Sequence, residues 1–306
     1  MTFYRLGLTG FPVSHSLSPK IQNAALKACD LEGSYSLFPI TPDDRQSLKD
    51  LLDRLRSGEI TGLNVTIPHK QNVIKFLDDL TATAKSIGAV NTIYLSRDKL
   101  IGDNTDAPGF LADLKKFLTL ECDSLLSHMQ ELAPALQKNA LILGAGGSAR
   151  AVLYALVNDG WNVTIAARRI EQAQQLADSF PNDKLLIIAK YPVGTNYKNL
   201  HDNLQSPISS FSLIVNTTPI GMAPNTHQSP LLENTSFSTH TKIYDLVYNP
   251  HETKLVKDAR AQGLAATTGL GMLIEQAALS FAIWTGHEPS REIMRSSVEQ
   301  SPVSNL

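Results

Sequence analysis

The sequence predicts an α/β protein that folds into two domains. Short apolar segments alternate with segments of helical periodicity along most of the chain, which is typical of strands and helices around a mostly parallel sheet. A glycine-rich turn near residue 144 separates an apolar strand from a helix and begins a second series of this kind. The length of 306 residues also exceeds what one domain usually holds.

The first series occupies the N-terminal part of the chain. In chain order we expect a strand at 4–10, a helix at 20–28, a strand at 35–40, a helix at 42–56, a strand at 62–67, a helix that follows residue 70 and reaches residue 80, a helix at 81–87, a turn and strand at 88–95, and a strand at 100–102. Ligands of parallel sheets bind beyond the carboxyl ends of the strands. Ser16, Ser18, Lys70, Asn91 and Asp106 lie at such ends or in the loops that follow them.

A helical linker at 108–138 leads into the second series. Its stretch from Glu121 to Gln137 mixes polar and apolar residues, so we expect an exposed helix or an insertion there, without an assigned function for residues 122–139. The remaining elements are expected as strands at 141–143, 162–167, 184–188, 213–216 and 242–245, and as helices at 148–157, 269–284 and 290–299.

The turn at residues 144–149 fits the G-x-G-x-x-G/A pattern of dinucleotide-binding folds. Gly144 allows the tight turn, Gly146 lets the backbone approach a pyrophosphate, and Ala149 lets the helix pack closely on the strand. A glycine turn also occurs in other α/β proteins, but here it joins a strand and a helix whose N-terminus can hold phosphates. The pattern indicates a Rossmann domain whose pyrophosphate contacts come from Gly144, Ala145, Gly146, Gly147 and Ser148.

Two arginines at the end of the next strand indicate which dinucleotide is bound. Enzymes that use NAD usually carry an acidic residue there, which binds the ribose 2′-hydroxyl. Arg168 and Arg169 instead suit a 2′-phosphate. We therefore expect NADP as the cofactor.

Composition excludes several other kinds of partner. The net charge of −2 gives no electrostatic support for binding nucleic acid or an acidic membrane. Cys29 and Cys122 are too few for a disulfide framework or a metal site, so no metal is expected. The sequence shows neither a signal peptide nor an apolar run long enough to span a membrane, and we expect a cytoplasmic protein.

Eight motifs, in order along nearly the whole chain, together resemble the shikimate dehydrogenase family. They are Ser16-Leu17-Ser18-Pro19, Asn64-Val65-Thr66-Ile67-Pro68-His69-Lys70, Gly88-Ala89-Val90-Asn91-Thr92, Gly102-Asp103-Asn104-Thr105-Asp106-Ala107-Pro108-Gly109, Gly144-Ala145-Gly146-Gly147, Asn216-Thr217-Thr218-Pro219-Ile220-Gly221-Met222, Asp245-Leu246-Val247-Tyr248-Asn249-Pro250 and Gly269-Leu270-Gly271-Met272-Leu273-Ile274-Glu275-Gln276. The resemblance implies a substrate-binding catalytic domain at 1–107, a Rossmann NADP domain at 108–268 and C-terminal helices at 269–306 that complete the catalytic domain. It also implies reversible, NADPH-dependent reduction of 3-dehydroshikimate to shikimate, on the route to chorismate and aromatic amino acids.

Lys70 and Asp106 are the candidate acid–base pair, and the resemblance implies that they are catalytic. A lysine ammonium can bind a carbonyl oxygen, stabilise the developing alkoxide and deliver a proton, while a neighbouring carboxylate holds the ammonium in place. By itself, Lys70 would be read as a surface lysine that follows a strand. Which of the two residues makes the formal proton transfer is left open by the sequence.

The candidate substrate ligands are short polar side chains. In an extended segment, Ser16 and Ser18 would face the same side and could bind a carboxylate; Ser18 can also cap the helix that follows. The resemblance adds hydroxyl-binding roles for Thr66, Asn91, Asp106 and Gln276, and places Tyr248 near the substrate carboxylate, where the alternative is a core tyrosine.

Four further cofactor contacts rest on the resemblance alone: Thr217, Leu246, Gly269 and Met272. The chain departs from the family pattern beside the expected phosphate, where the usual Asn-Arg-Thr is Ala167-Arg168-Arg169 and a further arginine is replaced by Gln172. These changes weaken the expected phosphate clamp, although Arg169 can compensate.

The sequence is compatible with two alternative functions. One is a quinate/shikimate dehydrogenase with broader substrate or NAD use, although the Ser16 and Ser18 pair favours shikimate because quinate-preferring relatives often carry threonine at the second position. The other is a non-catalytic dinucleotide sensor, which would be expected to lack Lys70 or Asp106. We expect a small-molecule substrate, no nucleic acid or membrane partner, and a monomer or homodimer.

Overall fold

The computed structural model describes residues 2–120, 138–180, 186–190, 208–231 and 235–299. The chain divides into two compact units, Met1–Gly109 with Leu273–Leu306, and Phe110–Met272. Two long helices, α5 (Asp106–Leu120) and α10 (Leu270–Thr285), carry the chain from one unit to the other. The predicted stretch 121–137 and the first two residues of the strand predicted at 184–188 lie outside the described residues.

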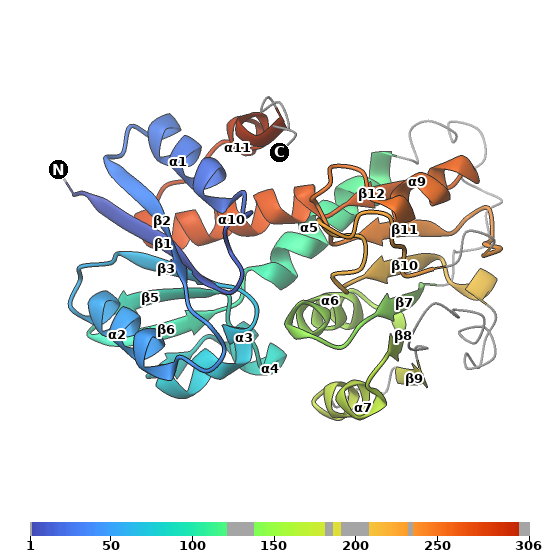
Figure 1. Ribbon diagram of the computed structural model, residues 1–306, viewed down its shortest axis with the longest axis horizontal. Helices are drawn as coiled ribbons and strands as arrows, with labels where there is room; N and C mark the ends of the chain where they lie inside the picture. The colour runs from blue at the N-terminus through green and yellow to red at the C-terminus, as the bar shows by residue number, and fades with distance from the viewer. Residues whose placement is uncertain (1, 121–137, 181–185, 191–207, 232–234, 300–306) are drawn as a thin grey trace. The chain divides into compact units, whose positions relative to one another are not determined.

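The first unit alternates strands and helices, as Figure 1 shows from blue to cyan. Its N-terminal elements are β1 (Tyr4–Gly10), α1 (Ser18–Ala28), β2 (Gly33–Pro39), α2 (Arg45–Arg56), β3 (Gly62–Val65), α3 (His69–Asn72), η1 (Val73–Phe76), β4 (Asp79–Leu80), α4 (Ala82–Ile87), β5 (Thr92–Ser96) and β6 (Lys99–Asp103). The C-terminal part of α10 and all of α11 (Arg291–Glu299) complete it.

The first sheet has the strand order β2-β1-β3-β5-β6-β4. The pairs β1–β2, β1–β3 and β4–β6 are parallel, whereas β5 runs antiparallel to both of its neighbours. The predicted, mostly parallel α/β arrangement is therefore confirmed. From β1 the chain passes to β2 on one side and then to β3 on the other, so the loops that follow β1 and β3 leave the sheet at a topological switch point.

The helix predicted between residue 70 and residue 80 is helical only as far as Phe76, and the prediction is wrong for residues 77–80. The chain forms one turn of α3 and the short 3₁₀ helix η1, and then becomes extended at Leu77. Tertiary pairing overrides the helical pattern, because the Asp78 N–H donates to the Leu100 carbonyl and the Asp78 carboxylate accepts from the Leu100 N–H. The segment therefore joins the edge of the sheet as β4.

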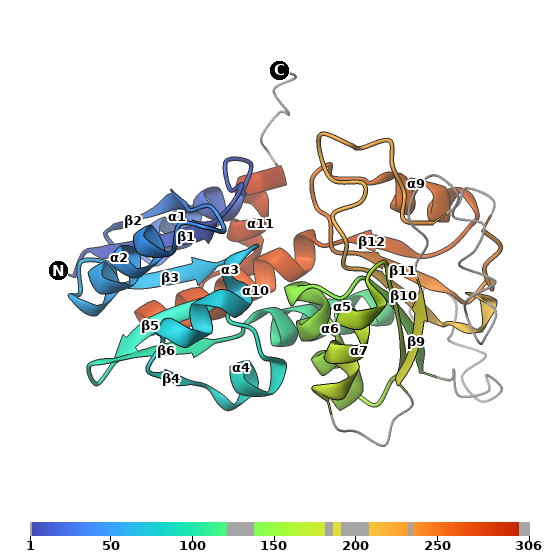
Figure 2. The same ribbon diagram turned by 60° about the horizontal axis from the view of Figure 1, so that its bottom comes forward.

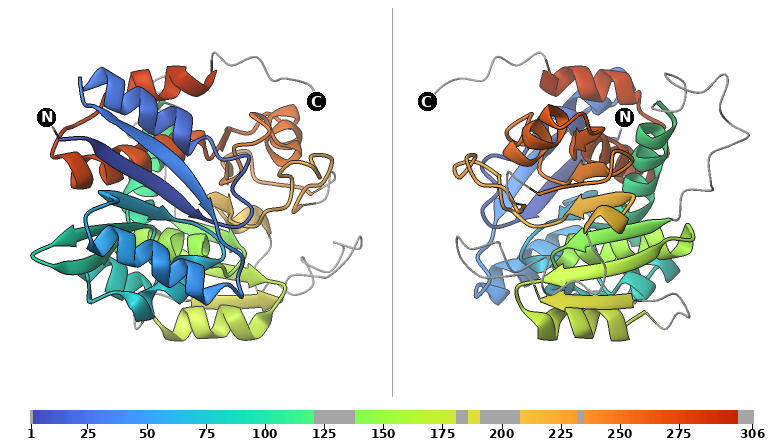
Figure 3. Two further views of the ribbon diagram at one scale, coloured as in Figure 1. Left: turned by 60° about the vertical axis from the view of Figure 1, so that its left-hand side comes forward. Right: turned by 90° about the vertical axis from the view of Figure 1, so that its right-hand side faces the viewer.

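The core of the first unit forms where α2 and α10 cover the sheet. Four leucines of α2 at helical spacing, which are Leu48, Leu51, Leu52 and Leu55, are buried against the sheet as their spacing predicted. In the left view of Figure 3, α2 lies across the strands. Trp284 of α10 contacts the backbone at Gly62, where an added Cβ would lie 2.4 Å from the indole, and its Nε1 donates to the Ile93 carbonyl.

The second unit contains a second series of strands and helices, which Figure 2 shows from green to orange. Its elements after α5 are β7 (Asn139–Leu143), α6 (Gly147–Asn158), β8 (Asn162–Ala167), α7 (Ile170–Asp178), β9 (Leu186–Lys190), η3 (Ile208–Ser210), β10 (Leu213–Asn216), β11 (Lys242–Asp245), α9 (Lys254–Ala261) and β12 (Ala266–Thr268). The sequence prediction missed α7, α9 and β12. These three elements are short, and Thr253 caps α9 by accepting a hydrogen bond from the Val256 N–H.

The second sheet has the order β12-β11-β10-β7-β8-β9, and every pairing in it is parallel. From β9 to β12 this is the strand order 3-2-1-4-5-6 of a Rossmann fold, so the predicted fold is confirmed. The right view of Figure 3 shows this sheet. Its topological switch point lies between β7 and β10, where Gly144 and Thr217 follow the two strands. No helix in the described part of the chain is long and apolar enough to cross a membrane.

Candidate active site

A buried ion pair joins the two candidate catalytic residues. Lys70 lies in α3, just after β3, and Asp106 is the first residue of α5, just after β6. The Lys70 Nζ and Asp106 Oδ2 atoms are 2.6 Å apart, and only 11% and 6% of the two side chains are exposed. This charge-assisted hydrogen bond fixes the ammonium at one place while leaving its other N–H donors available to a ligand.

Asn91 holds the second oxygen of the Asp106 carboxylate. The Asn91 Nδ2 donates to Asp106 Oδ1 at 2.9 Å and lies 3.3 Å from Gln276 Oε1. The Asn91 Oδ1 in turn accepts from the Thr105 N–H at 2.8 Å. Four predicted site residues from four separate segments of the chain are therefore joined by hydrogen bonds, and we call them the polar cluster: Lys70, Asn91, Asp106 and Gln276.

A deeper layer of buried polar residues supports Asn91, and the sequence prediction did not assign it to the site. The Ser280 hydroxyl lies 2.8 Å from Thr92 Oγ1 and 3.0 Å from Thr105 Oγ1, and it accepts from Asn64 Nδ2 at 3.1 Å. Two signals could have revealed this layer. Ser280 lies one turn after Gln276 on an apolar helix, and Asn64 interrupts an apolar strand.

The loop that carries Ser16 and Ser18 differs from the prediction in two respects. Leu17 has helical dihedral angles (φ −80°, ψ −11°), so the two serines are not arranged as in an extended strand. Leu17 is also the N-cap residue of α1, and Ser18 already belongs to the helix. The Ser16 hydroxyl accepts from the Ser18 N–H at 3.2 Å, because a side chain two residues earlier reaches the unpaired N–H of the first turn.

Thr66 belongs to the loop beside that serine loop. The Thr66 N–H donates to the Thr9 carbonyl, and the Phe11 N–H donates to the Ile67 carbonyl, both at 2.9 Å. A Cβ added to Gly10 would lie 2.4 Å from Thr66 Cγ2. The segments that follow β1 and β3 are thus adjacent at the switch point of the first sheet, and they carry Ser16, Ser18, Thr66 and Lys70.

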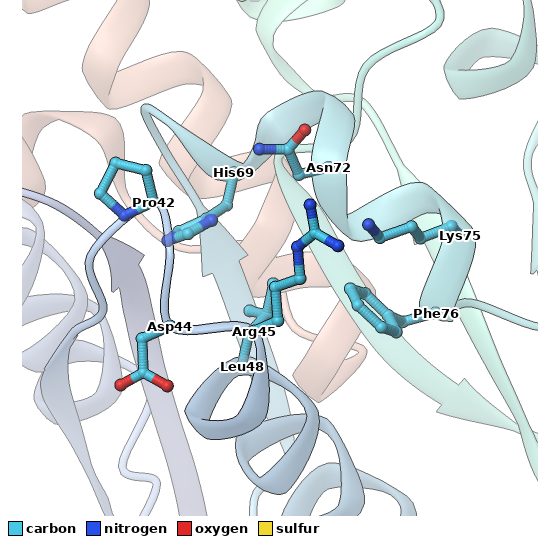
Figure 4. Close-up of a pocket in the computed structure, with 8 residues that line it drawn as sticks. All are labelled: Pro42, Asp44, Arg45, Leu48, His69, Asn72, Lys75 and Phe76. Carbon is cyan, nitrogen blue, oxygen red and sulfur yellow. The ribbon is translucent and has the colours of Figure 1, made fainter.

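His69 precedes Lys70, and its side chain lines a separate pocket (Figure 4). Its side chain is 1% exposed, and its Nε2 donates to the Ile40 carbonyl at 2.7 Å. The pocket has a volume of about 60 Å³ and is lined by Pro42, Asp44, Arg45, Leu48, His69, Asn72, Lys75 and Phe76. None of the predicted substrate or cofactor residues lines it.

The glycine turn of the second unit has the geometry that a pyrophosphate site needs. Gly144 has a φ of +114°, and a Cβ there would lie 2.6 Å from Thr217 Oγ1. Gly146 is the N-cap of α6 without a side-chain cap, and a Cβ there would meet no atom within 4 Å. The helix α6 therefore begins without a side-chain cap, and the N–H groups of an uncapped helix N-terminus can bind an anion.

The other predicted cofactor residues each follow the carboxyl end of a parallel strand. Arg168 and Arg169 follow β8, and both are exposed. Thr217 follows β10 and donates through Oγ1 to the Leu143 carbonyl at 2.7 Å. Leu246 follows β11, Gly269 follows β12, and Met272 lies buried in the first turn of α10.

Gly269 and Tyr248 also belong to the second unit. A Cβ on Gly269 would lie 2.2 Å from the Leu246 carbonyl oxygen, so the two segments can be this close only with glycine. Tyr248 is partly buried, and burial raises the pKa of its hydroxyl. The structure therefore places Tyr248 in the same unit as the predicted cofactor residues, whereas the other predicted substrate ligands lie in the first unit.

Comparison with known proteins identifies the family. The chain matches the model of the shikimate dehydrogenase substrate binding domain over residues 8–93, that of shikimate/quinate 5-dehydrogenase over residues 127–232 and that of the shikimate 5′-dehydrogenase C-terminal domain over residues 269–299. A shikimate dehydrogenase (NADP(+)) of Methanococcus maripaludis is 38% identical over 293 residues, which cover 96% of this chain and 95% of the relative. This chain belongs to the shikimate dehydrogenase family.

Solved structures of family members share the fold over nearly the whole chain. The shikimate 5-dehydrogenase of Thermus thermophilus, in complex with NADP(H) and shikimate, superposes with a TM-score of 0.77 at 34% identity and covers 96% of this chain and 98% of its own. The quinate dehydrogenase of Corynebacterium glutamicum, in complex with NAD, gives a TM-score of 0.80 at 29% identity and covers 97% and 99%. The family predicted from the motifs is confirmed.

Proposed function

We propose that this protein is an NADP-dependent shikimate dehydrogenase, which reduces 3-dehydroshikimate to shikimate reversibly. The observation that carries the proposal is the buried Lys70–Asp106 pair, because it places an ammonium donor and a carboxylate at one point of the first unit. Relatives that match almost the full length of the chain are shikimate dehydrogenases that use NADP. The reaction contributes to the biosynthesis of chorismate and the aromatic amino acids.

The substrate is held by the polar residues of the first unit. Ser16 and Ser18 bind the substrate carboxylate, because hydroxyl groups beside a helix N-terminus favour an anion. Thr66, Asn91, Asp106 and Gln276 bind the ring hydroxyls. Tyr248 is proposed as a further ligand of the carboxylate.

Lys70 acts on the oxygen of the reacting carbon. Its ammonium donates a hydrogen bond to the ketone oxygen, stabilises negative charge as this develops, and delivers a proton to the alkoxide. Asp106 orients the ammonium through the 2.6 Å hydrogen bond, which also allows a proton to pass between the two groups. In the reverse direction the same pair removes the proton from the substrate hydroxyl.

The second unit binds the cofactor, and NADPH supplies the hydride when it is bound there. The pyrophosphate is held by Gly144, Ala145, Gly146, Gly147 and Ser148. Arg168 and Arg169 bind the 2′-phosphate, since two exposed guanidinium groups follow the second strand of the Rossmann order. Thr217, Leu246, Gly269 and Met272 contact the ribose and nicotinamide side.

The test is a turnover assay that follows reduced nicotinamide absorbance at 340 nm. Purified protein receives shikimate or quinate, each with NADP or NAD. Turnover with shikimate and NADP, at a kcat/KM at least roughly tenfold above every other pair, supports the proposal. Comparable rates with quinate or NAD would assign the protein to the broader quinate/shikimate class, and no turnover with any pair would support the sensor alternative.

A monomer or a homodimer is proposed, and size-exclusion chromatography with light scattering distinguishes the two. A cytoplasmic location is proposed from the composition and is tested by cell fractionation.

A further inference from the structure

A buried carboxylate lies at the carboxyl end of β11, and the proposed reaction does not use it. Asp245 is completely buried, and its carboxylate accepts hydrogen bonds from Asn216 Nδ2 at 2.8 Å, from Thr253 Oγ1 at 2.7 Å and from the Val247 N–H at 3.1 Å. Burial raises the pKa of this carboxyl group from 3.8 to about 6. The three hydrogen bonds lower the pKa, but burial has the larger effect. Keeping a carboxylate in such a place costs stability, so the residue calls for a function.

Asn216 extends this arrangement to the neighbouring strand. It is the last residue of β10, and its Oδ1 accepts from the Thr218 N–H at 3.0 Å and from Thr218 Oγ1 at 2.6 Å. Asn216, Thr218, Asp245 and Thr253 thus form a continuous chain of hydrogen bonds, which we name the Asp245 cluster. The cluster connects the ends of two adjacent strands on one side of the switch point of the second sheet.

The segments held by the Asp245 cluster carry predicted cofactor residues. Thr217 lies between Asn216 and Thr218, and its hydroxyl contacts the Leu143 carbonyl beside the Gly144 turn. Leu246 follows Asp245 directly, and its N–H donates to the Asn216 carbonyl at 2.9 Å. Thr217 and Leu246 are therefore each next in sequence to a member of the Asp245 cluster. The backbone N–H of each also donates a hydrogen bond that fixes its position.

We propose that Asp245 and Asn216 are positioning residues for NADP, which hold the segments 217–218 and 246–247 in the conformation that binds the cofactor. The proposal rests on the proposed function for the identity of the ligand. Loops at the ends of strands are mobile unless they are tied down, and a displacement of about 1 Å is enough to weaken a binding site. A buried carboxylate can accept from both segments at once, which an apolar side chain cannot do.

The experiment measures binding of NADP+ alone by isothermal titration calorimetry, and the KM for shikimate separately. Asp245→Asn puts an NH₂ group where the carboxylate accepted hydrogen bonds, and we expect NADP+ affinity to fall roughly tenfold. The KM for shikimate is expected to stay within about twofold, because the substrate ligands of the first unit are untouched. The matched control is Asp178→Asn, which also removes a carboxylate that accepts from a side-chain amide, Gln174 Nε2 at 2.8 Å, but on an exposed helix surface.

Two more variants separate positioning from loss of folding. Thr253→Val keeps the carboxylate and removes one donor, and it is expected to weaken NADP+ binding by a smaller factor with an unchanged circular dichroism spectrum. The double variant Asn216→Asp/Asp245→Asn exchanges the two side chains and so restores an amide–carboxylate pair between the strands. We expect it to recover at least half of the NADP+ binding free energy that Asp245→Asn loses.

Each outcome bears on the proposal. Unchanged NADP+ affinity in folded Asp245→Asn protein would overturn it, and so would an equal rise in the KM values for NADP and shikimate. Wild-type protein that binds NADP+ but does not oxidise shikimate would refute the proposed reaction and leave the positioning role intact. Wild-type protein that does not bind NADP+ would overturn both.

Discussion

Replacing Lys70 with methionine removes the proposed proton donor and keeps a side chain of similar length. In the wild-type protein the ammonium lies 2.6 Å from Asp106 Oδ2, and both side chains are almost completely shielded from water. A positioned acid of this kind contributes a factor of about 10² to 10⁴ in rate, which corresponds to roughly 2.7 to 5.4 kcal/mol in the activation free energy. We expect kcat for shikimate oxidation to fall by this factor.

The same substitution has a cost in stability that must be measured separately. Removing one partner of a buried ion pair costs about 3–5 kcal/mol when the remaining charge has no other partner. Asp106 keeps the hydrogen bond from Asn91 Nδ2, so we expect a loss nearer to about 2 kcal/mol. Urea unfolding gives this value, and the kinetics are then measured well below the melting temperature of the variant.

The assay compares kcat and the KM for shikimate at saturating NADP. We expect the KM to change by less than about fivefold, because the proposed substrate ligands Ser16, Thr66 and Gln276 are unchanged. Lys85→Met in α4 is the control, since Lys85 is exposed and lies outside the polar cluster. A Lys70→Met variant that is folded and keeps kcat within threefold of wild type would refute the role of Lys70.

Lys70→Arg distinguishes proton transfer from charge stabilisation. Arginine keeps the positive charge next to Asp106 but does not release a proton at any ordinary pH. If Lys70 delivers the proton, Lys70→Arg loses nearly as much kcat as Lys70→Met. Wild-type-like activity of Lys70→Arg would show that the charge suffices and that the proton comes from elsewhere.

Four other substitutions test the two units. Arg168→Ala is expected to raise the KM for NADP by roughly 10- to 100-fold and to leave the KM for NAD unchanged, because the contact proposed for the exposed Arg168 is with the 2′-phosphate, which NAD lacks. Equal effects on both cofactors would contradict this role. Gly144→Ala forces a Cβ onto a residue with φ +114°, and we expect calorimetry to show at least roughly tenfold weaker NADP+ binding with unchanged shikimate KM. Burial raises the pKa of Asp245 to about 6 in the folded protein, from its ordinary value of 3.8. Between pH 3.8 and about pH 6 the folded state therefore binds more protons than the unfolded chain. The free energy of unfolding should therefore fall by up to about 3 kcal/mol as pH rises through that window, and urea unfolding at several pH values should show this fall in wild type and lack it in Asp245→Asn. Gly62→Ala places a methyl group 2.4 Å from the ring of Trp284, so we expect a loss of about 1–3 kcal/mol in urea unfolding; a neutral effect would show that the indole can move away.

The sequence by itself determined the fold class and the strands that begin and end at local signals. The strands Tyr4–Gly10, Asn162–Ala167, Leu213–Asn216 and Lys242–Asp245 have the bounds expected from the apolar runs. These elements are readable because the alternation of apolar segments with turn residues depends only on neighbours along the chain. The glycine turn at Gly144 is readable for the same reason, since only glycine adopts its φ without strain.

Tertiary structure decided the segments whose partners are distant in sequence. Residues 77–80 show a helical pattern, yet they pair with β6 because the Leu100 backbone offers both a donor and an acceptor to Asp78. The turn at Leu17 likewise differs from the extended segment expected from the alternation of Ser16 and Ser18. In both places a contact or a helix start that the local pattern does not encode determines the backbone.

The geometry of the polar cluster also came only from the folded chain. Separate sequence motifs indicated each member of this cluster. No spacing in the sequence indicates that Asn91 connects Asp106 with Gln276, which lies 185 positions after Asn91. The sequence analysis did not assign Ser280 or Asn64 to the site, because a single polar residue in an apolar segment gives no indication of its hydrogen-bond partner. Their hydrogen bonds exist because the fold buries them together, and a buried polar group must find its partner among whatever groups the packing places beside it.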